Sequence, residues 1–398
     1  MRVAIVGWGY DSGLGDEAAV LERYSTLVGW SEAIREAGVD EVVVVQRFHR
    51  ESRVARNGVT YRFCRDSRNP RLASWAASPA VTHAIIALQP DVVHVNGLGF
   101  PIQTWRLRQR IPRSAAFVVQ DHASGAPTVS RVDWSALVRN ALRRRAMHEI
   151  DAFFFTAAEQ AEPWKAAGLI GDGQRIVAIA EGSTQMRPMA RDEARTVSRV
   201  DGNPAVLWVG RLNANKDPLC IVDACALALA ERPDLTLTMV YSEADLLPAI
   251  TERLKRHPAL APRVRLVGSV PHDRLVHFYS ASDVFVLGSH HEGSGYALIE
   301  ACACGLPPAV TDIPSFRALT GRGAAGRLWP VGNAHACAAA ILSIYANHSL
   351  ERSRVRDHFD RALAWRAIGH EARAAYEVIV HDRRSRRVGT SDRSADTK

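Results

Sequence analysis

Two glutamates separated by a glycine-containing turn are the strongest candidates for ligand-binding side chains in this sequence. Residues 292–300 read Glu-Gly-Ser-Gly-Tyr-Ala-Leu-Ile-Glu and follow a mostly apolar run at 283–287 that is typical of a buried strand. Glu300 lies four residues beyond Tyr296, about 6 Å along a helix, which is comparable to the distance from a diphosphate to its ribose. We therefore expect Glu300 to accept ribose hydroxyls and Glu292 to hydrogen-bond the hydroxyls of a sugar. The alternative is that both glutamates simply face solvent.

The turn between these glutamates predicts an anion site. Its two glycines let the backbone approach a ligand closely, and the amides that follow would form the first turn of a helix over 294–305. Because a helix N-terminus attracts negative charge, a diphosphate fits there. The turn residues that we assign to this site are Gly293, Ser294, Gly295 and Tyr296.

Two cations follow an earlier strand and add to this anion site. Residues 209–218 read Val-Gly-Arg-Leu-Asn-Ala-Asn-Lys-Asp-Pro, so Arg211 and Lys216 lie between an apolar run and a helical segment. A planar guanidinium can grip phosphate oxygens and an ammonium adds a compact charge, so the pair would neutralise a diphosphate leaving group without metal. Taken by itself, this stretch is explained equally well by surface cations in local salt bridges.

A metal site is not expected, although His290 and His291 directly precede Glu292. Adjacent histidines point in different directions, and no further ligand motif accompanies them. The six cysteines show neither CxxC spacing nor the density of a disulfide scaffold, so we interpret them as reduced core residues. Cys302 and Cys304 would pack on the same helix.

The strands and helices that carry these side chains are predicted to form two similar halves of the chain. Short β-like runs alternate with helical segments, and such alternation predicts parallel sheets covered on both faces. In the first half the runs are at 3–6, 41–46, 91–95, 116–120, 152–156 and 176–180, and a helical stretch over 17–37 is stopped by Gly38. In the second half the runs are at 205–209, 235–241, 263–267, 283–287 and 308–310. Ligands of doubly wound sheets bind beyond the carboxyl ends of the strands, so we expect function in the loops that follow strands.

The predicted fold is therefore α/β, with two doubly wound, Rossmann-like domains facing across a cleft. The expected divisions are a first domain at 1–185, a polar linker at 186–203, a second domain at 204–360, a C-terminal helix at 361–380 and a disordered basic tail at 381–398. A chain of 398 residues suits two such domains.

Composition restricts the partners. With 47% apolar and 23% charged residues, the chain has the balance of a soluble globular protein. No apolar run approaches the roughly 18 residues that span a bilayer, and the opening run is too short for a signal peptide, so we expect a cytoplasmic protein. Lys and Arg exceed Asp and Glu by 50 to 42, a net charge of +8. The basic cluster at 143–145 is best interpreted as a solvated helix face, which implies no nucleic-acid partner and at most weak peripheral contact with a membrane.

The two chemical stretches together, in this order and about 80 residues apart, resemble the GT-B fold glycosyltransferases, specifically the large retaining family usually numbered four (glycosyl transferases group 1). Weaker agreement runs over roughly residues 1–345. The resemblance implies a nucleotide-sugar donor held by the second domain and an acceptor held mainly by the first domain. We expect the nucleotide of the donor to be UDP or GDP. The resemblance also implies retention of the anomeric configuration, no cofactor and no metal. The acceptor stays open between a glycan, a lipid and a small molecule.

Carried onto this chain, the resemblance assigns Arg211 and Lys216 to the diphosphate, Glu300 to the ribose, and Glu292 with the 293–296 turn to the sugar and phosphates. It places Val270, in the 267–272 loop, beside the base. It also implies that a C-terminal helix at 365–380 returns to the first domain.

The first domain departs from the family pattern in two places. Where many relatives carry a Gly-Gly pair, this chain reads Ser-Gly-Leu-Gly-Asp at 12–16, and Gly15 is the best match for donor binding. Relatives often place a histidine after the strand equivalent to 116–120. Here either His122 or Gln120 fills that position, with His122 favoured as a catalytic residue and an ordinary loop histidine as the alternative.

Other functions remain open at this point. A sugar-nucleotide epimerase or hydrolase would use the same fold, and a non-catalytic nucleotide-sugar-binding subunit would keep the same pocket. A nicotinamide dehydrogenase is disfavoured, because the glycines at 13 and 15 begin well past the first strand and the second strand ends at Gln46-Arg47 rather than at an acid.

Overall fold

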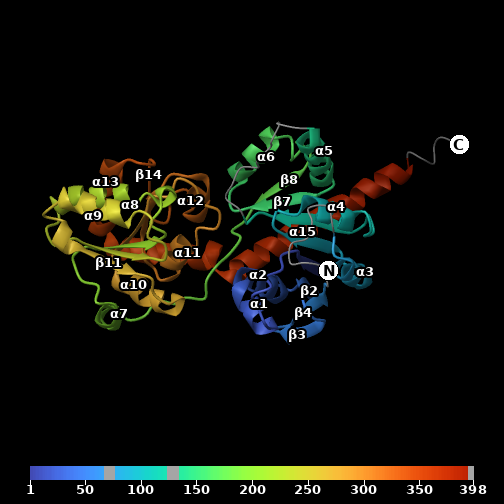
Figure 1. The fold of residues 1–398 in the computed structure, drawn as a ribbon, viewed down its shortest axis with the longest axis horizontal. Coiled ribbons are helices and arrows are strands. Elements are labelled where there is room, and N and C mark those ends of the chain that lie inside the picture. The colour runs from blue at the N-terminus through green and yellow to red at the C-terminus, as the bar shows by residue number, and fades with distance from the viewer. Residues whose placement is uncertain (67–76, 123–133, 393–398) are drawn as a thin grey trace. The chain divides into compact units, whose positions relative to one another are not determined.

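The computed structural model describes residues 1–66, 77–122 and 134–392, and it divides into two compact units. Unit 1 contains residues 1–182 and the chain from Trp365 onward, and unit 2 contains residues 183–364 (Figure 1). Unit 2 is thus inserted into the sequence of unit 1.

Unit 1 is built on an eight-stranded sheet in the order β3-β4-β2-β1-β5-β6-β7-β8. Every neighbouring pair is parallel except β3 with β4. The strands are β1 (Arg2–Gly7), β2 (Glu41–Phe48), β3 (Ser52–Arg56), β4 (Val59–Arg65), β5 (Val92–Asn96), β6 (Ala116–Gln120), β7 (Ala152–Phe155) and β8 (Arg175–Ala178). The six strands that the apolar runs predict are all present. The hairpin of β3 and β4 was not predicted, since β3 is short and largely exposed.

Helices cover both faces of this sheet because alternate residues of its strands are apolar on both sides. Val3 and Ile5 belong to one core and Ala4 and Val6 to the other. The helical segments are α1 (Glu17–Arg23), α2 (Ser25–Glu36), α3 (Pro79–Leu88), α4 (Pro101–Arg108), α5 (Trp134–His148), η1 (Ala158–Ala161), α6 (Glu162–Ala166) and α15 (Trp365–Asp392). The helix predicted over 17–37 is divided at Tyr24, and Gly38 ends it with a φ of 96° as expected.

The C-terminal helix α15 packs against α2 within unit 1 (Figure 1). A Cβ added at Gly369 would lie 2.3 Å from the carbonyl oxygen of Ala33, so only glycine permits so close an approach of these two helices. Ile368, Ala372 and Tyr376 are fully buried in the same core. The helix continues to Asp392, beyond the span of 365–380 inferred from the sequence, so the first part of the predicted tail is helical. Residues 393–398 of that tail lie outside the described residues.

Unit 2 is built on a six-stranded sheet, with every neighbouring pair parallel, in the order β11-β10-β9-β12-β13-β14. The strands are β9 (Ala205–Gly210), β10 (Thr236–Tyr241), β11 (Val264–Gly268), β12 (Val284–Leu287), β13 (Pro308–Thr311) and β14 (Arg327–Trp329). Five of them match predicted runs, and the three-residue β14 was missed. The sequence interpretation of two repeated α/β units is confirmed.

The helical segments of unit 2 lie between and after these strands. They are α7 (Arg191–Ser198), η2 (Ala214–Lys216), α8 (Pro218–Leu229), α9 (Leu247–Lys255), η3 (Ala261–Arg263), η4 (His272–Arg274), α10 (Leu275–Ala281), α11 (Tyr296–Ala303), α12 (Pro314–Leu319), α13 (Ala334–Ala346), α14 (His348–His358) and the π-helical turn η5 (Phe359–Leu363).

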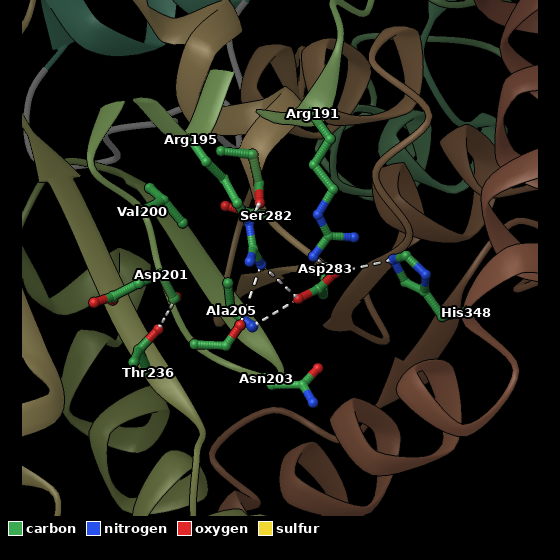
Figure 2. Close-up of polar contacts among 12 residues, drawn as sticks. Arg191, Arg195, Val200, Asp201, Asn203, Ala205, Thr236, Ser282, Asp283 and His348 are labelled. Atoms are coloured by element: carbon green, nitrogen blue, oxygen red, sulfur yellow. Dashed lines mark hydrogen bonds and ion pairs between the residues drawn. The ribbon is translucent and has the colours of Figure 1, made fainter. Parts of the chain in front are cut away.

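The segment predicted as a linker at 186–203 contains the helix α7, and a buried carboxylate holds that helix to the unit. Figure 2 shows Arg191, Arg195 and His348 converging on Asp283, which directly precedes β12. Asp283 also accepts the amide of Ala205 at 2.9 Å. Burial by itself would raise the pKa of Asp283, but the hydrogen bonds from His348 and Ala205 and the charge of Arg191 outweigh burial and lower it. The polar composition that suggested a linker is therefore explained by ion pairing.

Candidate functional site

A cavity of about 310 Å³ opens in unit 2 at the carboxyl ends of β9, β10 and β11. This is where a ligand of a doubly wound sheet is expected. Its lining comes from the ends of these strands and the loops that follow them, from the loop after β12 and from the starts of α10 and α11. It consists of Val209, Gly210, Arg211, Lys216, Val240, Tyr241, Ser242, Ser269, Val270, Leu275, Glu292, Ser294, Tyr296 and Ala297.

Most of the residues that sequence reasoning assigned to a donor line this one cavity. Arg211 and Lys216 come from the loop after β9, Val270 from the loop after β11, and Glu292 and Ser294 from the loop after β12. Tyr296, the first residue of α11, joins them. The segments 209–218 and 292–300, which are about 80 residues apart in the sequence, therefore adjoin in the lining of one cavity.

An ion pair between Lys216 and Glu292 connects these two parts of the wall. Lys216 Nζ lies 2.5 Å from Glu292 Oε2, and only 8% of Lys216 is exposed. Burial makes this pair unlike an ordinary surface salt bridge, since removing either partner leaves a charge with little access to water. Local salt bridging, the alternative interpretation of this stretch, is thus observed, but inside the cavity wall.

Asn215 fastens the loop of Lys216 to the loop of Glu292. Its side chain donates to the carbonyl of His291 at 3.0 Å and accepts the amide of His291 at 3.0 Å, while its carbonyl accepts the amide of His290 at 2.8 Å. Gly288 lets the loops approach, because an added Cβ would lie 3.3 Å from the carbonyl oxygen of Lys216. Sequence reasoning assigned no role to Asn215, and its position next to Lys216 was the only signal.

Arg211 reaches the rim of the cavity. Its side chain is about half exposed and its nearest acidic partner is Glu243, at 3.6 Å between Nη1 and Oε1. An exposed pair of this length contributes little to stability, so the guanidinium remains available to an anion that enters the cavity. Its fork of N–H donors suits phosphate oxygens.

Of the two glycines in the turn before α11, Gly295 is required by the backbone conformation and by the close packing around it. Gly295 is the N-cap of α11 with a φ of 62°, and an added Cβ would lie 2.5 Å from Leu319 Cδ1. Gly293 neighbours the lining residues Glu292 and Ser294 without lining the cavity itself. The first turn of α11 forms part of the wall through Tyr296 and Ala297, and the N-terminal end of a helix favours negative charge there.

Glu300 lies behind the wall rather than in it. The residue is 6% exposed and does not line the cavity, and both of its carboxylate oxygens already have a hydrogen-bond partner. The hydroxyl of Tyr279 donates to Oε2 at 2.9 Å, and Nε2 of His272 lies 2.6 Å from Oε1. Burial, the charge of Glu300 and the hydrogen bond to it raise the pKa of Tyr279 well above its usual value, so this phenol stays protonated. The ribose role of Glu300 remains a prediction.

One part of the cavity is apolar. Val209, Val240, Val270 and Leu275 contribute aliphatic side chains there, and Ser242 and Ser269 add hydroxyl groups. Such a lining suits the flat face and polar edge of an aromatic base. The residues that follow β10 were not singled out from the sequence, although their position after a strand was a usable signal.

The two predicted site residues of unit 1 lie after its strands. Gly15 is exposed in the loop between β1 and α1, with nothing within 4 Å of an added Cβ. His122 follows β6, and its Nδ1 lies 3.2 Å from the buried carboxylate of Glu181. Gln120, the alternative to His122, is 2% exposed and its Oε1 lies 3.1 Å from His94 Nε2. His122 is therefore the more accessible of the two.

Tyr376 from α15 fixes His94 behind this position. The tyrosine hydroxyl lies 2.5 Å from His94 Nδ1 and accepts from Trp30 Nε1 at 3.1 Å. A consistent assignment has Tyr376 donating to Nδ1 and Nε2 donating to Gln120 Oε1. Complete burial, aided by the nearby His122, lowers the pKa of His94 to about 3, so the ring is neutral.

Other chemical candidates from the sequence are structural. All six cysteines are buried, and burial raises the pKa of Cys302 and of Cys304 to about 12. His290 contacts Asp217 at 3.4 Å, and the described residues contain no group of three or more side chains placed to hold a metal.

Within the basic cluster at 143–145, the guanidinium of Arg143 lies over the ring of Trp164, while Arg144 and Arg145 are exposed. No helix among the described residues is both long enough and apolar enough to cross a bilayer.

Residues 190–358 match the family model described as "Glycosyl transferases group 1". The chain is 31% identical over 153 residues to a D-inositol 3-phosphate glycosyltransferase of Thermobispora bispora, which covers 36% of this chain and 35% of the relative. It is 28% identical over 183 residues to the GDP-mannose:cellobiosyl-diphosphopolyprenol alpha-mannosyltransferase of Xanthomonas campestris, covering 44% of this chain and 46% of the relative. The chain thus spans less than half the length of these curated relatives.

Solved structures share the fold over nearly the whole chain. Sucrose-phosphate synthase from Thermosynechococcus elongatus has a TM-score of 0.65 at 19% identity and covers 96% of this chain and 99% of that one. HepE from Anabaena, in complex with UDP and glucose, has a TM-score of 0.64 at 14% identity and covers 95% of this chain and 100% of that one. The predicted α/β fold with two Rossmann-like units of the GT-B type is confirmed.

Proposed function

We propose that this chain, whose residues 190–358 match the family model of the glycosyl transferases group 1 and whose fold is of the GT-B type, transfers a sugar from a nucleotide-diphosphate donor to an acceptor. The observation that carries the proposal is the cavity of unit 2, where Arg211, Lys216, Glu292 and the first turn of α11 line one wall. Two cations and a helix N-terminus suit a diphosphate.

Each part of the proposed donor is assigned to a different part of the cavity. The aliphatic side chains near Val240 and Val270 receive the base, the cationic wall receives the diphosphate, and Glu292 hydrogen-bonds the sugar. Glu300, behind the wall, accepts the ribose hydroxyls. UDP or GDP is the proposed nucleotide, since HepE forms a complex with UDP and glucose and the Xanthomonas relative is a GDP-mannose-dependent mannosyltransferase.

The proposed reaction retains the anomeric configuration and needs no metal, as in the family numbered four. The bond from the anomeric carbon to the β-phosphate oxygen weakens first, and negative charge grows on the diphosphate. Arg211, Lys216 and the start of α11 stabilise that charge. The acceptor hydroxyl attacks the same face, its proton passes to the departing phosphate oxygen, and the nucleoside diphosphate leaves.

The acceptor and the place of action belong to the same proposal. Unit 1 holds the acceptor, with His122 the more accessible polar residue after β6 and Gly15 in its first loop. The six buried, unpaired thiols suit the reducing cytoplasm. Any weak contact with an anionic membrane surface would involve α5, where Arg144 and Arg145 are exposed.

Two measurements test this function. A thermal-shift screen with UDP, GDP, ADP and their sugars should raise the melting temperature for one nucleotide class in the wild type. Arg211→Ala should keep the fold but lower turnover at least about tenfold, the cost of a lost charge-assisted hydrogen bond. Near-normal turnover in that variant would refute the assignment. Release of free sugar or an altered donor without acceptor would instead identify a hydrolase or epimerase, and binding without turnover a non-catalytic subunit.

A further inference from the structure

The hydrogen bond between His272 and Glu300 closes off the carboxylate that the donor ribose is proposed to use. His272 begins the turn η4, two residues past Val270, and Glu300 lies three residues past Ala297. Val270 and Ala297 both line the cavity, whereas Glu300 does not. The 2.6 Å bond between Nε2 and Oε1 therefore lies beside the cavity wall, at its nucleoside end.

The two partners of Glu300 differ in how easily they can move. Tyr279 is completely buried, and its hydroxyl donates to Oε2 from the helix α10. His272 has 70% of its side chain exposed. Releasing an exposed ring costs little because water replaces its contacts, whereas releasing a buried phenol would leave it without a partner. Oε2 is thus fixed in place, and Oε1 is the atom that can change partner.

We propose that His272 is a gate on ribose recognition, which covers Glu300 in the empty site and swings out when the two hydroxyls of a ribonucleotide take its place. The inference rests on the proposed function, because it requires a ribonucleotide in the cavity. Once His272 has left, Oε1 offers both of its lone pairs to the ribose while Oε2 stays bound to Tyr279.

The gate is sensitive to pH. The groups that face His272 among the described residues are Glu300 from α11 and Asp273 from its own turn, with Tyr279 of α10 bound to the same carboxylate. The hydrogen bond to Glu300 raises the pKa of His272 above its ordinary value in the empty site. Protonation therefore strengthens the closed state, and a ribonucleotide must bind more weakly as the pH falls.

The decisive comparison uses UDP and GDP, each beside its 2′,3′-dideoxy counterpart, with dissociation constants measured by calorimetry at pH 5.5 and pH 8.0. At pH 5.5, His272→Ala should bind the preferred ribonucleotide about threefold to tenfold more tightly than wild type, the size of one exposed charge-assisted hydrogen bond. The gain should shrink at pH 8.0. The dideoxy nucleotide, which has no hydroxyls for Glu300, should bind wild type and variant equally.

Two further variants serve as controls. His272→Gln keeps a neutral donor at every pH, so it should keep the closed contact and lose the extra weakening at low pH. His335→Ala removes an exposed histidine of α13 that does not line the cavity, and it should bind like wild type. Since UDP and GDP gain a proton on the terminal phosphate at a pKa of about 6, each variant is compared with wild type at the same pH.

Four outcomes would overturn the gate. Weaker ribonucleotide binding by His272→Ala at both pH values would make His272 a support of Glu300. If His272→Ala changed the dissociation constants of the ribonucleotide and the dideoxynucleotide equally, His272 would have no role in ribose recognition. Failure of wild type to bind any of the four nucleotides would remove the proposed function itself. If Lys216→Ala weakens both kinds of nucleotide while His272→Ala alters neither, the proposed function stands and the gate falls.

Discussion

Lys216 and Glu292 are 76 residues apart in the sequence, and their side chains meet at 2.5 Å in the wall of the cavity. Lys216 places a positive charge in the cavity lining that also contains the start of α11, and Glu292 neutralises this charge in the empty site. A diphosphate that enters can share the ammonium, and the carboxylate of Glu292 can accept hydrogen bonds from sugar hydroxyls.

We expect Lys216→Ala to weaken binding of the preferred nucleoside diphosphate by about tenfold to a hundredfold, as measured by calorimetry. The ammonium contributes a charge-assisted hydrogen bond, and its loss leaves Glu292 to repel the phosphates. Adding Glu292→Gln to this variant should restore part of the affinity. Lys255→Ala, which breaks an exposed pair with Glu252, is the matched control and should bind like wild type. Unchanged affinity in Lys216→Ala would contradict the anion site.

Asn215→Ala should lower both the stability of unit 2 and its affinity for nucleotide. Two side-chain hydrogen bonds to His291 are lost, worth about 1–2 kcal/mol together, and the loops carrying Lys216 and Glu292 can separate. Asn215→Asp keeps the acceptor for the His291 amide but loses the donor, so it should fall between alanine and wild type. Thermal unfolding and calorimetry measure the two effects. A normal affinity in Asn215→Ala would show that the loops hold their positions without this clamp.

Unit 1 should lose stability on mild acidification because of His94. Its pKa is about 3 in the folded chain and about 6.5 in the unfolded chain, so between these values the unfolded state binds the extra proton. The contribution of neutral His94 to the free energy of unfolding is fully present above pH 6.5 and declines by about 1.4 kcal/mol per pH unit below that value. Urea unfolding at pH 7.5, 6.0 and 5.0 measures the slope. His94→Phe should be less stable at pH 7.5 yet show a flatter slope, and an unchanged slope would refute the assignment.

The ionised carboxylate of Asp283 should stabilise unit 2, and this stabilisation should persist to a lower pH than the stabilisation that neutral His94 gives to unit 1. Its lowered pKa means that its contribution is present above the unfolded value of about 3.9 and is lost as the pH falls through the folded value. Asp283→Asn should cost about 2–4 kcal/mol, less than a fully buried pair because both arginines reach solvent. Asp312→Asn, in an exposed pair with Arg317, is the control and should cost less than about 1 kcal/mol. Equal costs in the two variants, measured by denaturant unfolding, would contradict the anchoring role.

Apolar runs predicted most of the strands because a parallel strand covered on both faces must be apolar throughout. The run at 116–120 coincides with β6, and Gly38 ends its helix where predicted. The strand β14 has only three residues and gives no such signal. The polar stretch predicted as a linker contains α7, and the sequence gives no sign of this helix's anchoring because its arginines meet Asp283 only in three dimensions.

The sequence predicts which charged residues lie at the candidate site, but it does not predict which of them contact one another. Strand–loop–helix patterns placed Lys216 and Glu292 at the same edge of a sheet, yet nothing in the sequence indicates that they touch. Glu300 was expected to be open to a ribose, whereas Tyr279 and His272 bind it in the empty site. Those partners lie 21 and 28 residues away and are visible only once α10 and η4 are packed against α11.

The discontinuity of unit 1 has a consequence for biosynthesis. Domains generally fold in order as the ribosome releases them, but the core around Trp30 and His94 lacks Tyr376 until the whole of unit 2 has been translated. A nascent chain that stalls before α15 would leave this aromatic surface open to water. Unit 2 is therefore the first of the two units that can finish folding, although its synthesis begins later.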